Sequence, residues 1–176
     1  FMLIKNGNSE VYNEDSDVQY LTTRQLTGSR NLYKNTVPSV VLVVTEYGLG
    51  TGMIIDRNHI LTNWHVVDGS EEAAIVQYDR KYTSLDKIQK YDVIEGTVAA
   101  IDMERDLALV RVDYNLNNPV IFGKYYNLDP AQDVFAIGHP SGGAFWSFGY
   151  GTISNIIEDE EWTYDGRVGH KASVIQ

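Results

Sequence analysis

The chain has 176 residues, a length that suits one ordinary domain or two very small ones. Hydrophobic residues make up 43% of it and charged residues 22%, proportions that exclude a disordered or collagen-like chain. A net charge of -10 would repel a nucleic-acid backbone, so we expect no nucleic-acid partner. The absence of cysteine excludes disulfides, thiolate nucleophiles and cysteine-ligated metals.

Residues 1–36 are predicted to form a polar N-terminal extension with one short helix near residues 32–35. From Pro38 onward, β-branched and apolar runs alternate with turn signals, a pattern typical of antiparallel strands. Residues 37–113 are predicted to be a first β-barrel with a loop insertion over 80–91. Its six predicted strands cover residues 40–44, 50–56, 59–62, 73–78, 93–101 and 107–112.

Residues 114–132 are rich in asparagine, carry two prolines and are predicted to link two barrels. Three further strands are predicted within residues 133–176, at 134–137, 149–157 and 172–175. Six strands fill a small barrel, whereas three leave long unpaired edges, which folded proteins avoid. The sequence therefore predicts an all-β fold in which the first barrel is complete and the second is only partly covered.

No run of residues approaches the roughly 18 apolar residues of a membrane-spanning helix, so no membrane span is expected. The apolar start at residues 1–5 is too short for the core of a signal peptide.

A histidine and an acid stand at the ends of two predicted strands. His65 comes just past the strand at 59–62, and Asp106 lies at the mouth of the apolar strand at 107–112. An acid in that position is expected to be partly buried and to need a hydrogen-bond donor, such as the Nδ1–H of a histidine. This pairing fixes the imidazole tautomer and leaves Nε2 to take a proton.

Two alternatives to that pairing remain open at this point. His65 could be a structural or surface histidine, and Asp106 could form an ion pair with Arg105 or Arg111. Trp64, beside the histidine, is interpreted as a packing residue without a catalytic role.

The order and kind of the motifs resemble a known family. GTGMIID at 50–56, ILTNWHVV at 60–67 and DLALV at 106–110 look like the trypsin-like serine peptidases. AIGHP at 136–140 and GYGTIS at 149–154 are similar to the HtrA (Deg-type) branch of that family. The resemblance covers about residues 37–176. It implies a chymotrypsin-like pair of six-stranded β-barrels with the active site in the cleft between them.

The resemblance also implies a function, a serine endopeptidase that acts on proteins or peptides by a Ser-His-Asp mechanism. His65 matches the general base and Asp106 the acid that orients it. The implied enzyme needs no cofactor and no metal. A homo-oligomer and a bacterial periplasmic or secreted location are further implications of this resemblance.

The family's nucleophilic serine lies in a Gly-Asn-Ser-Gly-Gly-Pro type motif, about a dozen residues after the strand that residues 174–176 resemble. We therefore expect the serine beyond Gln176, in a C-terminal remainder that completes the second barrel, and expect residues 1–176 alone to be inactive. Ser141 is the one tempting internal serine, but His139 stands where a Gly-x-Ser-x-Gly elbow needs glycine. The alternative function is a catalytically inactive chymotrypsin-fold protein that serves as a binding or scaffold module.

The remaining polar and aromatic features receive simpler interpretations. His139 and His170 are interpreted as loop histidines, and no metal site is predicted because His59 and His65 lack ligand spacing. The acidic run at 158–161 is interpreted as a solvated loop, with repulsion of acidic substrates or calcium binding as weaker alternatives. The aromatic segment 144–148 either covers the open end of the second barrel or contacts a substrate or partner.

Overall fold

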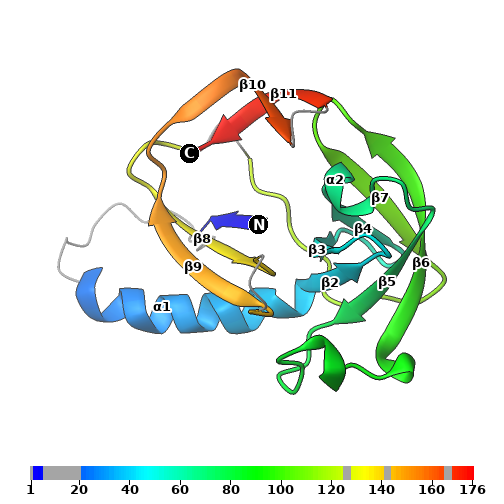
Figure 1. Ribbon diagram of the computed structural model, residues 1–176. Coiled ribbons are helices and arrows are strands. Elements are labelled where there is room, and N and C mark those ends of the chain that lie inside the picture. The colour runs from blue at the N-terminus through cyan, green and yellow to red at the C-terminus, as the bar shows by residue number, and fades with distance from the viewer. Residues whose placement is uncertain (1, 6–20, 125–127, 141–143, 165–167) are drawn as a thin grey trace.

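The computed structural model describes residues 2–5, 21–124, 128–140, 144–164 and 168–176. Its main element is a closed six-stranded antiparallel barrel with the strand order β2-β3-β4-β7-β6-β5 (Figure 1). The strands are β2 (Val40–Val44), β3 (Leu49–Ile54), β4 (His59–Thr62), β5 (Glu72–Gln77), β6 (Val93–Asp102) and β7 (Leu107–Val112). The closed six-stranded barrel of the predicted fold class is thus confirmed. Each of the six predicted strands differs from the observed one by at most two residues at an end.

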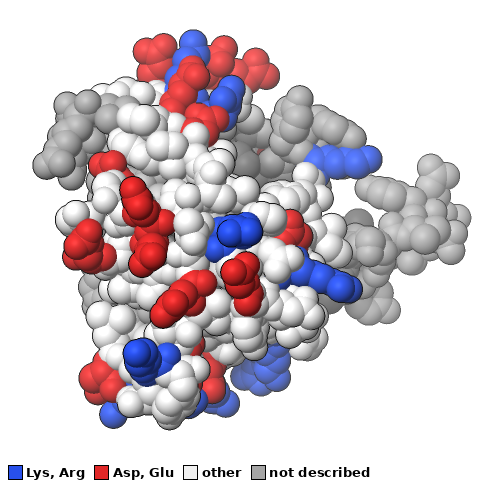
Figure 2. All heavy atoms as spheres, turned by 90° about the vertical axis from the view of Figure 1, so that its right-hand side faces the viewer, with Lys and Arg blue, Asp and Glu red and all other residues white. Residues whose placement is uncertain are grey.

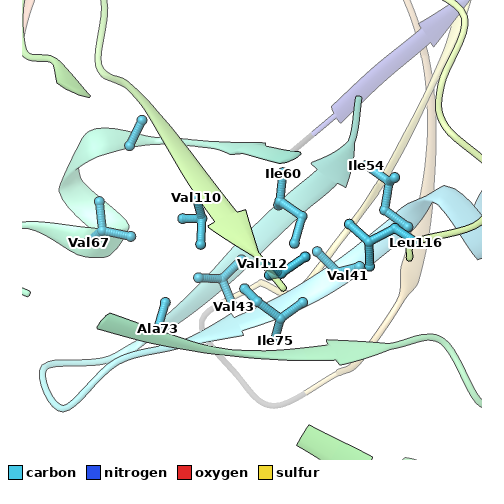
Figure 3. Packing of buried hydrophobic residues seen from close by; sticks show 11 residues of the cluster. Val41, Val43, Ile54, Ile60, Val67, Ala73, Ile75, Val110, Val112 and Leu116 are labelled. Atoms are coloured by element: carbon cyan, nitrogen blue, oxygen red, sulfur yellow. The ribbon is translucent and has the colours of Figure 1, made fainter. Parts of the chain in front are cut away.

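The barrel interior is filled by β-branched and other aliphatic side chains. Along β3, half-buried and buried residues alternate, which follows from the two-residue period of a strand. Figure 3 shows inward-pointing side chains that meet from several strands, among them Val43, Ile60 and Val110, all with no exposed surface. Burial of each such side chain contributes about 1.5–3 kcal/mol. Gly52 faces the same interior, where a Cβ would lie 2.6 Å from Ile60 Cγ2, so only glycine leaves room there.

The strands after the barrel form two separate small sheets. β8 (Asp133–Gly138) pairs with β9 (Ser147–Thr152) and also with β1 (Met2–Lys5), so the chain start joins the later half of the protein. β10 (Ile156–Tyr164) and β11 (Val168–Ile175) form a hairpin of their own. Within the described residues these strands form no second closed barrel.

Two predictions in this region were wrong. The single strand expected at 149–157 is split between β9 and β10, because the chain turns at Ser154 and Asn155, whose amides both donate to the Gln176 carbonyl, at 2.6 and 3.3 Å. The acidic run at 158–161 lies in β10 rather than in a loop. Asp159 has a φ of 55° at a register shift in that strand, which marks a β-bulge, and the side chains of Glu158, Asp159 and Glu161 are exposed.

The N-terminal extension holds more helix than predicted. The helix α1 (Leu21–Thr36) has 16 residues, in place of the short helix expected at 32–35. It continues into a 3-10 turn, η1 (Val37–Ser39), where Pro38 ends the regular α-helix. Tyr33 fixes its C-terminal half, since its hydroxyl donates to the Trp146 carbonyl at 2.9 Å.

Three short helical segments complete the fold. One-turn α2 (Trp64–Val67) follows β4, and the 3-10 turns η2 (Leu85–Lys87) and η3 (Lys90–Asp92) lie between β5 and β6. The two 3-10 turns occupy the segment predicted as a loop insertion. Carboxylates are spread over the molecular face in Figure 2, and basic side chains are interspersed among them.

Candidate active site

His65 is carried by the short helix α2, directly after strand β4. Trp64 and Val67 of this helix are buried and anchor it on the barrel, whereas the His65 side chain is 29% exposed. The helix ends after one turn, at Asp68, and Gly69 follows with a φ of 75°, a conformation that favours glycine. The buried residues of α2 therefore hold the His65 imidazole at the surface of the barrel.

Asp106 lies in the tight turn between β6 and β7, with its side chain turned inward. The residue is only 5% exposed and has a φ of 54°, a left-handed conformation that is uncommon outside glycine. Its carboxylate has several donors. Oδ1 accepts from the His65 backbone N–H at 2.9 Å, and Oδ2 accepts from His65 Nδ1 at 2.7 Å.

Asn63 also contacts Asp106, a role that the sequence prediction missed. Its side-chain amide donates to the Asp106 carbonyl at 3.0 Å and to Asp106 Oδ2 at 3.2 Å. The residue directly before α2 therefore holds both the backbone and the carboxylate of the acid. The position of Asn63 between the strand and the histidine indicated that it lies near the site. Its contact with Asp106 spans 43 residues, so no local sequence pattern predicts that contact.

The hydrogen bonds determine what the pair can do chemically. A carboxylate oxygen only accepts, so Nδ1 of His65 carries the proton and Nε2 is the nitrogen able to take up another. The buried Asp106 carboxylate then lies where it stabilises the imidazolium that such an uptake produces. This geometry is suited to general-base chemistry at Nε2.

The alternative partners of Asp106 do not form. Arg105 Nη1 pairs with Asp102 Oδ2 at 2.8 Å, and its backbone N–H donates to Asp102 Oδ1. Within the described residues no ion pair joins Arg111 to Asp106. The structure therefore brings His65 and Asp106 together, whereas Ser141 lies outside the described residues.

The interpretation of His170 as a loop histidine was wrong, whereas His139 does lie in a loop and is buried there. His139 follows β8 directly and is 7% exposed, while His170 lies within β11 and is 1% exposed. The His139 backbone N–H donates to Thr51 Oγ1 at 2.8 Å, and the Thr51 hydroxyl lies 3.1 Å from His139 Nδ1. Burial lowers the pKa of His139 to about 4, so this imidazole is neutral near pH 7.

Neither of two cavities on the described surface is lined by the His65–Asp106 pair. A cavity of about 130 Å³ borders the site and is lined in part by Thr62, Asn63 and Leu107. A cavity of about 750 Å³ lies between α1, the chain after β5 and the segment at Ala144–Trp146. The described residues contain no group of three or more His, Cys, Asp or Glu that could hold a metal ion. They also contain no helix long and apolar enough to cross a membrane.

A β-barrel that carries a histidine hydrogen-bonded to an aspartate at the ends of its strands is typical of the chymotrypsin-like peptidases. Residues 50–176 match the trypsin-like peptidase domain family, and the chain belongs to that family. The HtrA-like character of the sequence motifs is confirmed by the relatives and solved structures that the chain resembles.

Curated relatives from three groups of organisms are similar to the chain. It is 30% identical over 140 residues to Protease Do-like 1, chloroplastic, of Arabidopsis thaliana, covering 69% of this chain and 29% of the relative. It is 34% identical over 99 residues to the putative serine protease HhoB of Synechocystis sp., covering 55% of this chain and 21% of the relative. It is 34% identical over 95 residues to a probable periplasmic serine endoprotease DegP-like of Pseudomonas fulva, covering 53% of this chain and 18% of the relative. The chain thus spans less than a third of the length of these relatives.

Solved structures show the same fold. The crystal structure of Deg5 superimposes with a TM-score of 0.60 at 27% identity, over 81% of this chain and 68% of that one. The active form of the Rv3671c protease from M. tuberculosis gives a TM-score of 0.64 over 94% of this chain and 71% of that one. At 22% identity this second likeness concerns the fold alone.

Proposed function

We propose that the protein is a serine endopeptidase in which His65 is the general base and Asp106 orients it. The observation that carries the proposal is the 2.7 Å hydrogen bond from His65 Nδ1 to the buried Asp106 Oδ2, in a chain that belongs to the trypsin-like peptidase family. The nucleophilic serine is proposed to lie in the natural protein beyond Gln176. Residues 1–176 alone are therefore proposed to be inactive.

The proposed reaction is acyl transfer to serine and then to water. The serine Oγ attacks the scissile carbonyl carbon while His65 Nε2 takes the hydroxyl proton, and the imidazolium returns that proton to the leaving amine. Water then attacks the acyl-enzyme by the same proton transfers and releases the carboxylic acid. Throughout, Asp106 stabilises the imidazolium, and Asn63 together with the His65 backbone N–H keeps the carboxylate in place.

The substrates proposed for this chain are proteins or peptides, because its relatives are named as proteases. A bacterial periplasmic or secreted location is proposed on the name of the Pseudomonas fulva relative, which is called periplasmic. A homo-oligomer is part of the same proposal and rests on the resemblance to the HtrA branch alone.

The test is cleavage of an unfolded protein substrate by the natural full-length protein and two histidine variants. His65→Gln removes the proposed base, and we expect cleavage to fall by at least a thousandfold, the order of loss that follows removal of a triad member. His59→Gln is the matched control, because His59 lies on β4 and pairs with Asp56 rather than with Asp106. Undiminished cleavage by His65→Gln would contradict the proposal, and absence of cleavage by the unmodified protein would favour the inactive scaffold.

A further inference from the structure

A buried histidine that the proposed mechanism does not use lies behind the His65–Asp106 pair. His170 is the third residue of β11 and is 1% exposed. Its ring packs between two tryptophans, with centroid distances of 5.8 Å to Trp64 and 5.4 Å to Trp162. Figure 1 shows the β10–β11 hairpin reaching toward the side of the barrel that carries α2.

His170 is hydrogen-bonded to the turn that carries Asp106. Its Nδ1 lies 2.6 Å from the Met103 carbonyl oxygen, and since a carbonyl only accepts, Nδ1 carries the proton. The next residue repeats the contact, because the Lys171 backbone N–H donates to the Glu104 carbonyl at 2.7 Å. Two consecutive carbonyls of the turn are therefore bound by two consecutive residues of β11.

The turn needs such outside support. Asp106 is held at a φ of 54°, which costs free energy and persists only where the surroundings determine it. The turn's own closing bond, from the Asp106 N–H to the Met103 carbonyl, is 3.4 Å long and therefore weak. The Met103 carbonyl that closes the turn is the same one to which His170 donates.

The same imidazole also reaches the other member of the pair. Trp64 immediately precedes His65 in α2, and its buried ring contacts His170. One ring thus contacts both the turn of Asp106 and the helix of His65. We propose that His170 is a positioning residue, which fixes the relative placement of His65 and Asp106 by donating to Met103 and packing on Trp64. Its catalytic consequence rests on the proposed function, whereas the geometric consequence does not.

The hydrogen-bond donor of His170 and the bulk of its ring can be tested separately by substitution. Within the described residues His170 Nε2 has no hydrogen-bond partner, which is unfavourable for a buried polar atom. A leucine would fill a similar volume without that penalty, but it could not donate to Met103. An asparagine could, because its side-chain amide nitrogen takes the place of Nδ1.

The experiment compares His170→Leu with His170→Asn in the natural full-length protein. The first readout is the low-field proton NMR signal of the His65 Nδ1–H, which reports its hydrogen bond to Asp106. The second is kcat and KM for a peptide substrate. We expect His170→Leu to weaken the signal and to lower kcat about 10- to 100-fold at nearly unchanged KM, the order of loss for a slightly misplaced catalytic group. His170→Asn is expected to retain both to within a few-fold.

A stability control separates positioning from simple destabilisation. Ile153→Val trims a buried residue between β9 and β10 that makes none of these contacts, and we expect it to leave the signal and kcat unchanged. If His170→Leu does not fold, His170→Gln replaces it, because its longer amide cannot take the Nδ1 place. Unchanged signal and kcat in the variant without the donor, or an asparagine variant that behaves like it, would overturn the proposal.

Labelling of the same samples with a fluorophosphonate keeps the two proposals apart. If all variants are labelled at a serine but the His65 signal never changes, the positioning role fails and the peptidase stands. If none is labelled but the signal weakens in His170→Leu, the peptidase fails and the positioning role stands.

Discussion

Asp106 is the residue at which local strain, burial and charge coincide. It is buried, left-handed in backbone conformation, and hydrogen-bonded through both carboxylate oxygens to His65. The energetic cost of that arrangement is balanced by donors from three elements: Asn63 before α2, His65 within it, and β11 through the turn carbonyls. The hydrogen bond between His65 and Asp106 therefore depends on contacts between residues that are distant in the sequence.

Replacement of Asp106 by asparagine tests the charge without emptying the site. Asp106→Asn keeps the shape, but its amide favours the wrong imidazole tautomer, so we expect kcat of the natural protein to fall by about 10⁴-fold. Asp102→Asn is the matched control, since Asp102 ends β6 just before the turn of Asp106 but pairs with Arg105 at the surface. Comparable activity of the Asp106→Asn variant and the control would show that the carboxylate does not orient His65.

His139 gives the protein a defined dependence of stability on pH. Burial lowers the pKa of His139 in the folded state to about 4, below the ordinary value of 6.5. Between these pH values the imidazole is protonated in the unfolded chain but not in the folded one. Stability from this group is therefore fully present above about pH 6.5 and is lost as the pH falls toward 4, by on the order of 3 kcal/mol.

The measurement is urea unfolding of the chain at pH 7 and at pH 4.5, with and without His139→Gln. When the pH is lowered from 7 to 4.5, we expect the free energy of unfolding to decrease less in the variant than in the parent chain. Equal slopes in the two proteins would mean that His139 takes up its proton as readily in the folded state as in the unfolded one.

At the scale of elements, the close approach of β3 to α2 sets where His65 lies. A Cβ on Gly50 would fall 2.4 Å from Val66 Cγ2 and 2.7 Å from Val66 Cγ1, and a β-branched side chain has little freedom to move away. Because Val66 directly follows His65, any displacement of Val66 also displaces the histidine.

Gly50→Ala is expected to lower the free energy of unfolding by about 1–3 kcal/mol, the usual cost of overpacking. We expect it also to weaken the His65–Asp106 hydrogen bond. Gly48→Ala is the control, because a Cβ there meets nothing within 4 Å. Urea unfolding and the His65 Nδ1–H signal measure the two effects, and a Gly50→Ala variant equal to the control in both would contradict this packing argument.

The barrel strands were predictable because their signals are local. Alternating β-branched runs, turn residues such as Asp56–Asn58, and the motifs around His65 and Asp106 all lie within about ten residues of the feature they predict. The helix α1 was underestimated because its residues are polar. Its C-terminal half is held by Tyr33 on Trp146, a contact between residues 113 positions apart.

At the scale of the whole molecule, the later half of the chain is joined to the barrel by polar contacts and by an apolar cluster in which Ile137 and Trp146 pack against Leu42. Thr51 bonds to His139, Trp146 Nε1 donates to the Val40 carbonyl at 2.8 Å, and β11 bonds to Met103 and Glu104. Each of these contacts, like the contact of Asn63 with Asp106, joins residues that are tens of positions or more apart. Sequence patterns are local, so they could not assign roles to Asn63, His139 or His170. The division into a first barrel, a linker and a part of a second barrel stays a prediction.

The central claim is that the His65–Asp106 pair activates a serine of the same protein. The most direct measurement is fluorophosphonate labelling of the natural full-length protein, of its His65→Gln variant and of residues 1–176, with the labelled residue mapped by mass spectrometry. We predict labelling at a serine beyond Gln176 in the unmodified full-length protein only. Absence of labelling in every sample would contradict the peptidase and favour a scaffold, and labelling at Ser141 would place the nucleophile elsewhere than we propose.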